Sequence, residues 1–397
     1  MAAQPDHFLV GKRIIVAGGS FAGLSFILAL EKLWNSSLPR PEILMYEYDA
    51  RVKSIEKDPY MLNINGFSQD GGLVTIQDLG LLDDVRKYGT LNSGDIRVWS
   101  DNWKWLSSIN PTAYGNLPAA TIRITRENLK RILVQSAETT NTTLHWESAF
   151  TISDGTTQDC DLLVAADGAD SNIRACFRPK DMKTKYAGAT QIGGISRLTG
   201  LLPKPIDKDY VLQMSSGEGV CCIYNPFDKD TIAWAISTIG PEREAKTNFN
   251  EQEFETLKKE ALETASMFQE PFKTVVEATI PNTAFIRPAK EKYAFRHGDT
   301  SLKGVIFIGD ANHILSPYEF VGANLALKDG WDLAEQICRN GSSLDSAAAS
   351  YDRRSFARFD PVFKFSHERI GFGHSTGKKW LFYKYGMAAQ RKLKQVH

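Results

Sequence analysis

Residues 13–23 read RIIVAGGSFAG, an apolar run that stops at a glycine-rich turn. Such a run is typical of a buried parallel strand, and glycines at its end let the chain turn sharply into a helix whose free N–H groups can face a phosphate. Gly18 would make the turn, and Gly23 would permit close contact between the helix and the strand. The stretch predicts a β–α unit that binds a dinucleotide, with a turn in an unrelated β–α protein as the alternative. The residues expected along the phosphates are Gly18, Ser20, Phe21, Ala22 and Gly23.

Ser20 and Glu47 refine this prediction. Ser20 stands where the pattern usually has a second glycine, and its small hydroxyl can still fit and donate to a phosphate. Glu47 follows the apolar run at 42–46, close to the position about 20 residues downstream where such units carry an acid that binds ribose hydroxyls. An acid at this position favours an unphosphorylated ribose, as in FAD or NAD, over NADP.

Later stretches repeat the combination of an apolar run and a Gly/Asp turn. Residues 161–171 read DLLVAADGADS, and residues 305–313 read VIFIGDANH. The carboxyl ends of parallel strands deliver backbone and carboxylate groups to a ligand at one edge of the sheet. Turns of this kind in series therefore predict one large cofactor that is contacted along its whole length.

The composition excludes several classes of protein. The chain has 397 residues, 24% of them charged, and a net charge of zero, so no basic field indicates a nucleic acid or an anionic membrane as partner. Its 5 cysteines are odd in number and lack metal-ligand spacing, which favours a reduced protein and predicts no metal site. No uncharged apolar window approaches about 18 residues, so we expect no membrane span and a cytoplasmic location.

Three tryptophans, Trp99, Trp103 and Trp105, crowd into one short segment. Large aromatic side chains at this density indicate either a packed strand edge or a hydrophobic wall against a substrate. Both interpretations remain open from the sequence.

The order of predicted elements indicates an α/β fold. Apolar spacing predicts helices at 22–34, 72–88 and 324–339, whereas alternating strands between 185 and 239 indicate a mostly antiparallel sheet. We therefore expect a discontinuous Rossmann-like domain into which a second, sheet-rich domain is inserted. The expected segments are 10–75, 116–180 and 285–345 for the cofactor domain, 76–115 and 181–284 for the substrate domain, and 346–397 for a C-terminal helical segment.

Taken with the glycine turn, two segments make the chain similar to the class A flavoprotein monooxygenases, the group of the aromatic hydroxylases and the tetracycline-modifying enzymes. These segments are DLLVAADGADSNIR at 161–174 and GDANHILSPYEFVGAN at 309–324. The resemblance covers most of the chain. It implies the p-hydroxybenzoate hydroxylase-like fold, with an FAD-binding Rossmann-like domain, an inserted substrate-binding sheet and a C-terminal helix.

The resemblance also assigns roles to individual residues. It implies that Asp310 binds the ribityl hydroxyls of FAD and that Arg126 lies near the flavin phosphates. Asp167 and Gly168 would support both the flavin and the nicotinamide donor. The residues expected along the isoalloxazine ring are Pro317, Gly322, Ala323 and Asn324.

The activity that the resemblance implies is a monooxygenase reaction with FAD as cofactor, NADPH or NADH as transient electron donor, and O2 as co-substrate. A flavin C4a-hydroperoxide would hydroxylate or epoxidise a small hydrophobic substrate, such as a polycyclic natural product. The alternatives are a Baeyer–Villiger monooxygenase, a redox-neutral cyclase or oxidase, and a flavin-binding regulatory protein. No protein nucleophile is evident, and we expect a monomer or a weak homodimer.

The 309–324 segment departs from the family pattern at Phe320, where glycine is usual. Phe320 would either line the substrate cavity or lie on the surface of a rearranged loop. Glu319 is either a solvated loop acid or a proton-handling group above the cavity. His313 is expected to be a structural member of the loop rather than a general base.

Overall fold

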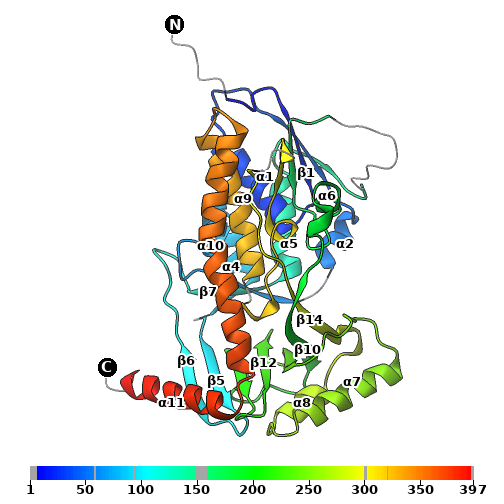
Figure 1. Ribbon diagram of the computed structural model, residues 1–397, viewed down its shortest axis with the longest axis vertical. Helices are drawn as coiled ribbons and strands as arrows, with labels where there is room; N and C mark the ends of the chain where they lie inside the picture. Colours follow the sequence, from blue (N-terminus) through cyan, green and yellow to red (C-terminus); the bar gives the residue numbers. More distant parts are fainter. Residues whose placement is uncertain are drawn as a thin grey trace.

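The computed structural model describes residues 7–57, 60–92, 94–148, 159–298, 302–319 and 321–394. A five-stranded sheet in the order β15-β9-β1-β2-β8 forms the upper part of the molecule in Figure 1. Every pairing in this sheet is parallel, as the apolar runs predicted. Its strands are β1 Arg13–Ala17, β2 Glu42–Tyr46, β8 Thr143–His145, β9 Leu162–Ala165 and β15 Val305–Phe307.

The lower part contains a seven-stranded sheet in the order β14-β10-β13-β12-β11-β5-β6 (Figure 1). Its neighbours pair antiparallel except β11 and β5, which run parallel. Its strands are β14 Phe285–Glu291, β10 Lys185–Arg197, β13 Thr231–Ile239, β12 Val220–Pro226, β11 Tyr210–Met214, β5 Ile96–Ser100 and β6 Trp105–Ile109. A three-stranded sheet between these parts contains β3 Met61–Asn65, β7 Thr121–Thr125 and β4 Thr90–Asn92.

Helices cover both sheets, and α10 runs lengthwise past both parts of the molecule (Figure 1). Thr125 caps α5, because its side chain accepts a hydrogen bond from the backbone N–H of Asn128. The helices are α1 Phe21–Leu33, α2 Arg51–Glu56, α3 Gly72–Leu79, α4 Leu82–Tyr88, α5 Arg126–Ala137, α6 Asn172–Phe177, α7 Glu251–Thr264, α8 Phe272–Glu277, α9 Gly322–Arg339, α10 Leu344–Gly373 and α11 Gly377–Lys394. Short 3₁₀-helices include η2 Pro281–Thr283, η4 Gly309–Ala311 and η5 Pro317–Glu319. None of the helices described has the length and apolar character needed to cross a bilayer.

The single helix predicted for 72–88 was wrong, because the chain forms α3 and α4 there. Gly80 ends α3 in the left-handed conformation, with a φ of 84°. Glycine adopts this conformation without steric cost, so it closes the helix although the apolar spacing continues on either side.

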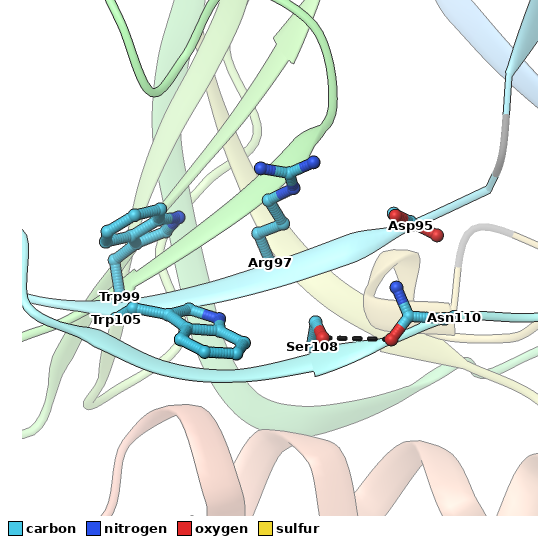
Figure 2. A pocket seen from close by; sticks show the side chains of 6 residues that line it. All are labelled: Asp95, Arg97, Trp99, Trp105, Ser108 and Asn110. Atoms are coloured by element: carbon cyan, nitrogen blue, oxygen red, sulfur yellow. Dashed lines mark hydrogen bonds between the residues drawn. The ribbon is translucent and has the colours of Figure 1, made fainter. Parts of the chain in front are cut away.

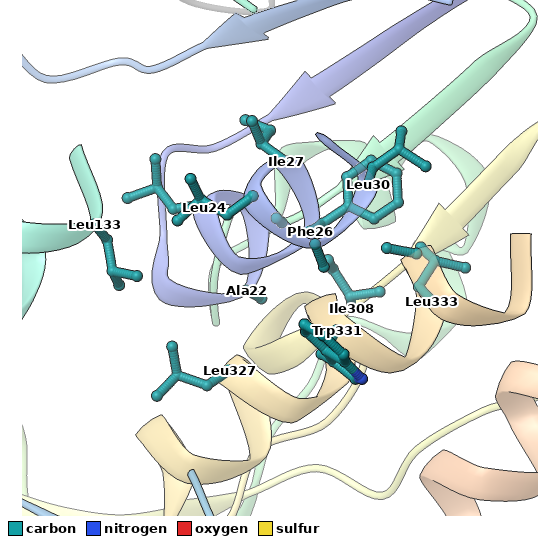
Figure 3. Close-up of a cluster of buried hydrophobic side chains, with 14 of the residues drawn as sticks. Ala22, Leu24, Phe26, Ile27, Leu30, Leu133, Ile308, Leu327, Trp331 and Leu333 are labelled. Carbon is teal, nitrogen blue, oxygen red and sulfur yellow. The ribbon is translucent and has the colours of Figure 1, made fainter. Parts of the chain in front are cut away.

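The core of the upper part lies where α1 crosses α9 (Figure 3). Gly330 permits this close crossing, since a Cβ at that position would lie 2.3 Å from the carbonyl oxygen of Ala22. Side chains on both sides of the crossing are fully or almost fully buried. They include Leu24, Phe26, Ile27, Leu30, Leu327, Trp331 and Leu333.

The borders of the domains remain a proposal. β14 begins at Phe285, where the last segment of the cofactor domain was predicted to begin, yet it pairs with β10 in the seven-stranded sheet. We therefore propose that the border lies after Glu291 and that β14 belongs to the substrate domain.

Replacing Gly330 with Ala should destabilise the protein. The added methyl group would overlap backbone atoms of α1, and overpacking of this kind costs about 1–3 kcal/mol. Urea unfolding of Gly330→Ala and of the control Gly386→Ala measures the effect. No atom lies within 4 Å of a Cβ at Gly386 in α11, so the control should be neutral or more stable by up to about 1 kcal/mol. Equal stability of the two variants would contradict the proposed role of the α1–α9 contact.

Candidate active site

A cavity of about 440 Å³ lies between the five-stranded and seven-stranded sheets. This volume falls within the range of ligand-binding clefts. The cofactor side of the cavity comes from α1, β3, the turn after β9, and the segment from Asp310 to α9. We call the opposite side the floor, because side chains of the seven-stranded sheet form it. The floor residues are Gln191, Tyr210, Ile223, Asn225, Ala233, Ala235, Phe285 and Arg287.

The glycine turn opens the cofactor side. Gly18 has a φ of 107°, and a Cβ there would lie 2.3 Å from the carbonyl oxygen of Ala166, so only glycine fits. Ser20 caps α1 by accepting a hydrogen bond from the N–H of Gly23 at 3.3 Å, which leaves its O–H free to donate. Ser20, Phe21 and Ala22 line the cavity, whereas Gly18 and Gly23 shape the turn behind it.

Glu47 lies against the glycine turn rather than in the cavity. One carboxylate oxygen accepts from the N–H of Gly19 at 2.8 Å, and the other accepts from the N–H of Asp49 at 3.1 Å. The acid therefore connects the end of β2 to the turn that follows β1.

Lys130 on α5 is a residue that the sequence analysis missed. Its ammonium group is buried and donates a hydrogen bond to the carbonyl oxygen of Gly19. Burial lowers the pKa of Lys130 to about 8, and the nearby Glu47 carboxylate acts in the opposite direction. The available signal was its place next to Leu129 on the apolar side of α5, where a lysine is unusual.

Arg126 begins α5 and lies above the ring of Phe21, with its guanidinium carbon 5.9 Å from the ring centre. It also donates to the carbonyl oxygen of Ser54 at 3.4 Å. These contacts place the positive charge of Arg126 near the N-terminus of α1, next to the expected phosphate position.

Asp167 and Gly168 follow β9, and Gly168 lines the cavity. One oxygen of Asp167 accepts from the N–H of Ile173 at 3.2 Å, whereas the other is buried without a hydrogen-bond partner. Burial raises the pKa of the Asp167 carboxyl group. An unpartnered buried oxygen of this kind is costly unless a ligand satisfies it.

Asp310 lines the cavity from η4, and its side chain is exposed towards the cavity. No side-chain or backbone donor among the described residues reaches its carboxylate. The protein around it raises the pKa of the Asp310 carboxyl group, since few water molecules can solvate the charge there.

Asp329 on α9 fixes the loop that carries Asp310. Its fully buried carboxylate accepts from the N–H of Gly309 at 3.0 Å and contacts His313 Nε2 at 2.7 Å and Arg358 at 2.6 Å. His313 and Arg358 hold the pKa of Asp329 well below its usual range despite its burial. His313 thus faces Asp329 rather than the cavity, as expected for a structural residue.

The expected ring-binding residues separate into two groups. Pro317, Gly322 and Ala323 line the cavity. Asn324 instead contacts β3, where it donates to the carbonyl oxygen of Asn63 at 2.9 Å and accepts from the N–H of Asn65 at 2.7 Å. α9 begins at Gly322 without a side-chain cap, so its first N–H groups are available to a ligand.

A hydrogen-bonded chain joins this loop to the floor side of the cavity. The Tyr318 hydroxyl contacts Ser237 Oγ, which lies 2.9 Å from His374 Nε2. His374 Nδ1 lies 2.7 Å from the carbonyl oxygen of Ile370, and burial lowers the pKa of His374. Because a carbonyl can only accept, Nδ1 carries the proton of the neutral ring, and Nε2 accepts from Ser237. Ser237 in turn accepts from Tyr318, so the chain holds η5 against β13.

Phe320 lies outside the described residues, and so does the side chain of Glu319. Their predicted positions at the cavity therefore remain predictions. The described residues also contain no group of three or more His, Cys, Asp or Glu side chains that could hold a metal ion.

The tryptophan cluster does not line the main cavity. Trp99 and Trp105 border a separate pocket of about 390 Å³ on the β5–β6 hairpin (Figure 2). Trp103 packs at 6.3 Å from Trp99, between ring centres, and donates to the carbonyl oxygen of Glu270 at 2.7 Å. These contacts are those of a packed strand edge.

The fold and the cavity define the class: a flavin-binding enzyme whose cofactor domain and substrate sheet enclose one active site. A family model described as "FAD binding domain" matches residues 68–363. "Monooxygenase cfoF" of Aspergillus candidus is 35% identical over 94% of this chain and 93% of its own length. "6-hydroxynicotinate 3-monooxygenase" of Pseudomonas fluorescens is 23% identical over 58% of each chain.

Solved structures share the fold. Klebsiella pneumoniae HpxO, complexed with FAD and uric acid, has a TM-score of 0.75 at 16% identity, covering 98% of this chain and 96% of its own. Pseudomonas aeruginosa PqsL, in complex with 2-aminobenzoylacetate, has a TM-score of 0.72 at 16% identity, covering 95% and 99%. The chain belongs to the class A FAD-dependent monooxygenases.

The residues of the cavity fit FAD. The turn at Gly18 excludes a side chain where a pyrophosphate would approach. The uncapped N-terminus of α9, and the first N–H groups of α1 that Ser20 does not bind, suit negative charge. Asp310 lines the cavity and presents a carboxylate, without a donor among the described residues, to a ligand that carries hydroxyl groups. In the described part of the chain the Asp310 carboxylate has no donor and α9 has no side-chain cap, and bound FAD would supply a partner to each.

Replacing Lys130 with Met should make the stability less dependent on pH. The folded pKa of Lys130 is about 8 and its ordinary value is 10.5, so the unfolded chain binds more protons between these pH values. Wild-type protein should therefore gain roughly 3 kcal/mol of unfolding free energy as the pH rises through this interval, and Lys130→Met should lack that gain. Urea unfolding across this pH range measures the difference. Lys259→Met, which removes an exposed ammonium on α7, is the control; a wild-type pH profile for Lys130→Met would contradict the assignment.

Proposed function

We propose that the chain consumes NADPH or NADH and inserts one oxygen atom of O2 into a hydrophobic, polycyclic natural product by hydroxylation or epoxidation. The observation that carries this proposal is that Ser20, Phe21 and Ala22, at the glycine turn, line the same cavity as the floor residues. FAD, when bound, supplies the redox chemistry that activates O2. The protein supplies binding, orientation and a space that excludes water.

The cofactor-binding roles follow the charges along the cavity. Arg126 and the N-terminus of α1 would bind the pyrophosphate beside the cavity. Glu47, which lies outside the cavity against the glycine turn, would bind the adenosine ribose there. Asp310 would accept hydrogen bonds from the ribityl hydroxyls. Pro317, Gly322 and Ala323 would lie along the isoalloxazine ring.

The nicotinamide donor would bind transiently. The sequence contains no second glycine fingerprint, so no dedicated nicotinamide domain is expected. Gly168 borders the cavity and has a φ of 86°, and it would leave the backbone accessible to the incoming donor. Ile223 and Phe285 on the opposite side would keep water away from the reacting atoms.

The function is tested by supplying the FAD-loaded protein with NADPH, isotopically labelled O2 and a fractionated metabolite extract. A product that contains one labelled oxygen, formed in proportion to the NADPH consumed, is expected. Its structure distinguishes hydroxylation or epoxidation from Baeyer–Villiger insertion. A product without the label, formed with no net NADPH consumption, would overturn the proposal in favour of an oxidase or cyclase.

Asp310→Asn should weaken FAD binding without destabilising the protein itself. Hydrogen bonds to a charged acceptor contribute about 1.5–3 kcal/mol, so the FAD dissociation constant should rise roughly 10- to 150-fold. The ratio of flavin to protein absorbance after gel filtration gives the occupancy, and thermal unfolding of the apoprotein tests the stability. Asp170→Asn, which changes an exposed acid in the turn after β9, should behave as wild type. Full FAD occupancy in Asp310→Asn would place the ribityl group elsewhere.

A further inference from the structure

Small residues lie at the centre of the floor. Ala235 on β13 lies opposite Gly193 on β10 and Ile223 on β12. A Cβ at Gly193 would lie 2.8 Å from the Cβ of Ala235, so no larger side chain fits beside it. On the β10 side of Ile223, only the methyl group of Ala235 and the hydrogen atom of Gly193 form the middle of the floor, which leaves space there for a flat ligand.

Two carboxamides lie at opposite corners of this low centre. Asn225 on β12 is opposite Ala233, and Gln191 on β10 is opposite Ser237. Because residues two apart on a strand share a face, the line between the two carboxamides crosses Ala235. Strand spacing and rise place their Cα atoms about 16 Å apart.

Both carboxamides are buried and lack protein partners. Asn225 is 8% exposed and Gln191 is 4% exposed, and both line the cavity. Asn225 Oδ1 has no hydrogen-bond partner. Within the described part of the chain, the carboxamide of Gln191 also makes no hydrogen bond. A buried polar group without a partner is unfavourable, so a ligand that satisfies both groups would be selected strongly.

The charge of the floor limits what this ligand can be. Among the floor residues named above, Arg287 is the charged one, and it is exposed at the outer strand β14. Its guanidinium carbon lies 4.7 Å from the ring centre of Phe285. Between Asn225 and Gln191 the floor is neutral, and a carboxamide can both donate to and accept from an uncharged hydroxyl, carbonyl or amide.

We infer that the substrate is an elongated, flat, uncharged molecule of about two or three fused rings, with a hydrogen-bonding group at each end. Asn225 would bind one end and Gln191 the other, with the rings above Ala235. These two residues would then select substrates by the length of the molecule and by the hydrogen-bonding groups at its two ends. The inference rests on the proposed function, because it takes the floor as the substrate side of the cavity.

The test is a binding series on the oxidised, FAD-loaded protein without NADPH, measured by isothermal titration calorimetry. The probes are 2,6-dihydroxynaphthalene, 2-hydroxynaphthalene and naphthalene-2,6-dicarboxylate. We expect the diol to bind about 5- to 10-fold more tightly than the mono-alcohol, and the dicarboxylate to bind most weakly. Equal binding of the diol and the mono-alcohol, or tighter binding of the dicarboxylate, would overturn the inference without any substitution being made.

The variants Asn225→Leu and Gln191→Met test each end. Either single variant should reduce diol affinity to that of the mono-alcohol. The mono-alcohol itself should be almost unaffected by a single variant, because it can use the remaining carboxamide, and should weaken only in the double variant. Asn282→Leu in η2, an exposed site, is the control.

Failure of this inference and failure of the proposed function are separable. FAD occupancy, NADPH consumption and labelled product report on the function, whereas the probe series reports only on the floor. A protein that oxygenates an extract component yet binds the diol and the mono-alcohol equally would retain its function and lose the assigned specificity. If a single variant weakened the binding of all three probes equally, the floor would be misfolded in that variant. This result would contradict the inference that Asn225 and Gln191 bind the two ends of the ligand independently.

Discussion

The carboxylate of Asp329 holds together the elements on which the cavity depends. It accepts from the N–H of Gly309, contacts His313 and pairs with Arg358, so η4, α9 and α10 meet at one fully buried group. A buried charge is tolerated only when its partners satisfy it, and here they hold its pKa low. Asp310 follows Gly309 in the chain, so the group that anchors Gly309 also sets where Asp310 faces the cavity.

Helix α10 connects the buried Asp329 carboxylate to the floor side of the cavity. Arg358 lies in the first half of this helix and pairs with Asp329 and Asp332 on α9, whereas His374 caps its C-terminal end and contacts Ser237 on β13. Tyr318 completes the connection, because its hydroxyl joins η5 to Ser237. One helix thus fixes both sides of the cavity relative to each other, as its course past both sheets indicates (Figure 1). The distance between the cofactor loop and the floor is therefore set in part by contacts of Tyr318, Ser237 and His374.

The sequence predicted the parts of the site that depend on local structure. A glycine turn, a capped helix and an acid after a strand are recognisable because neighbouring residues impose them. Gly18 lies in the turn after β1, and Ser20 and Asp310 line the cavity, whereas their roles towards a cofactor remain predictions. Gln191 and Asn225 gave no such signal. They come together with Ala235 only through the pairing of strands far apart in sequence, and this register is not a local property. Lys130 was missed for a related reason, since its partner Gly19 belongs to another element.

The distribution of charge around the cavity suits an anionic cofactor at one end and the neutral substrate inferred above at the other. Positive groups, the Arg126 guanidinium, the buried Lys130 ammonium and the N-terminus of α1, gather at the glycine turn. The floor between Asn225 and Gln191 carries no charge of its own. In a space with little water, each charge acts over a longer distance than in solution, so an anionic substrate would be drawn towards the glycine turn and away from the neutral part of the floor. Separating the positive end from the neutral floor would therefore orient the cofactor and, under the inference above, disfavour an anionic substrate at the floor.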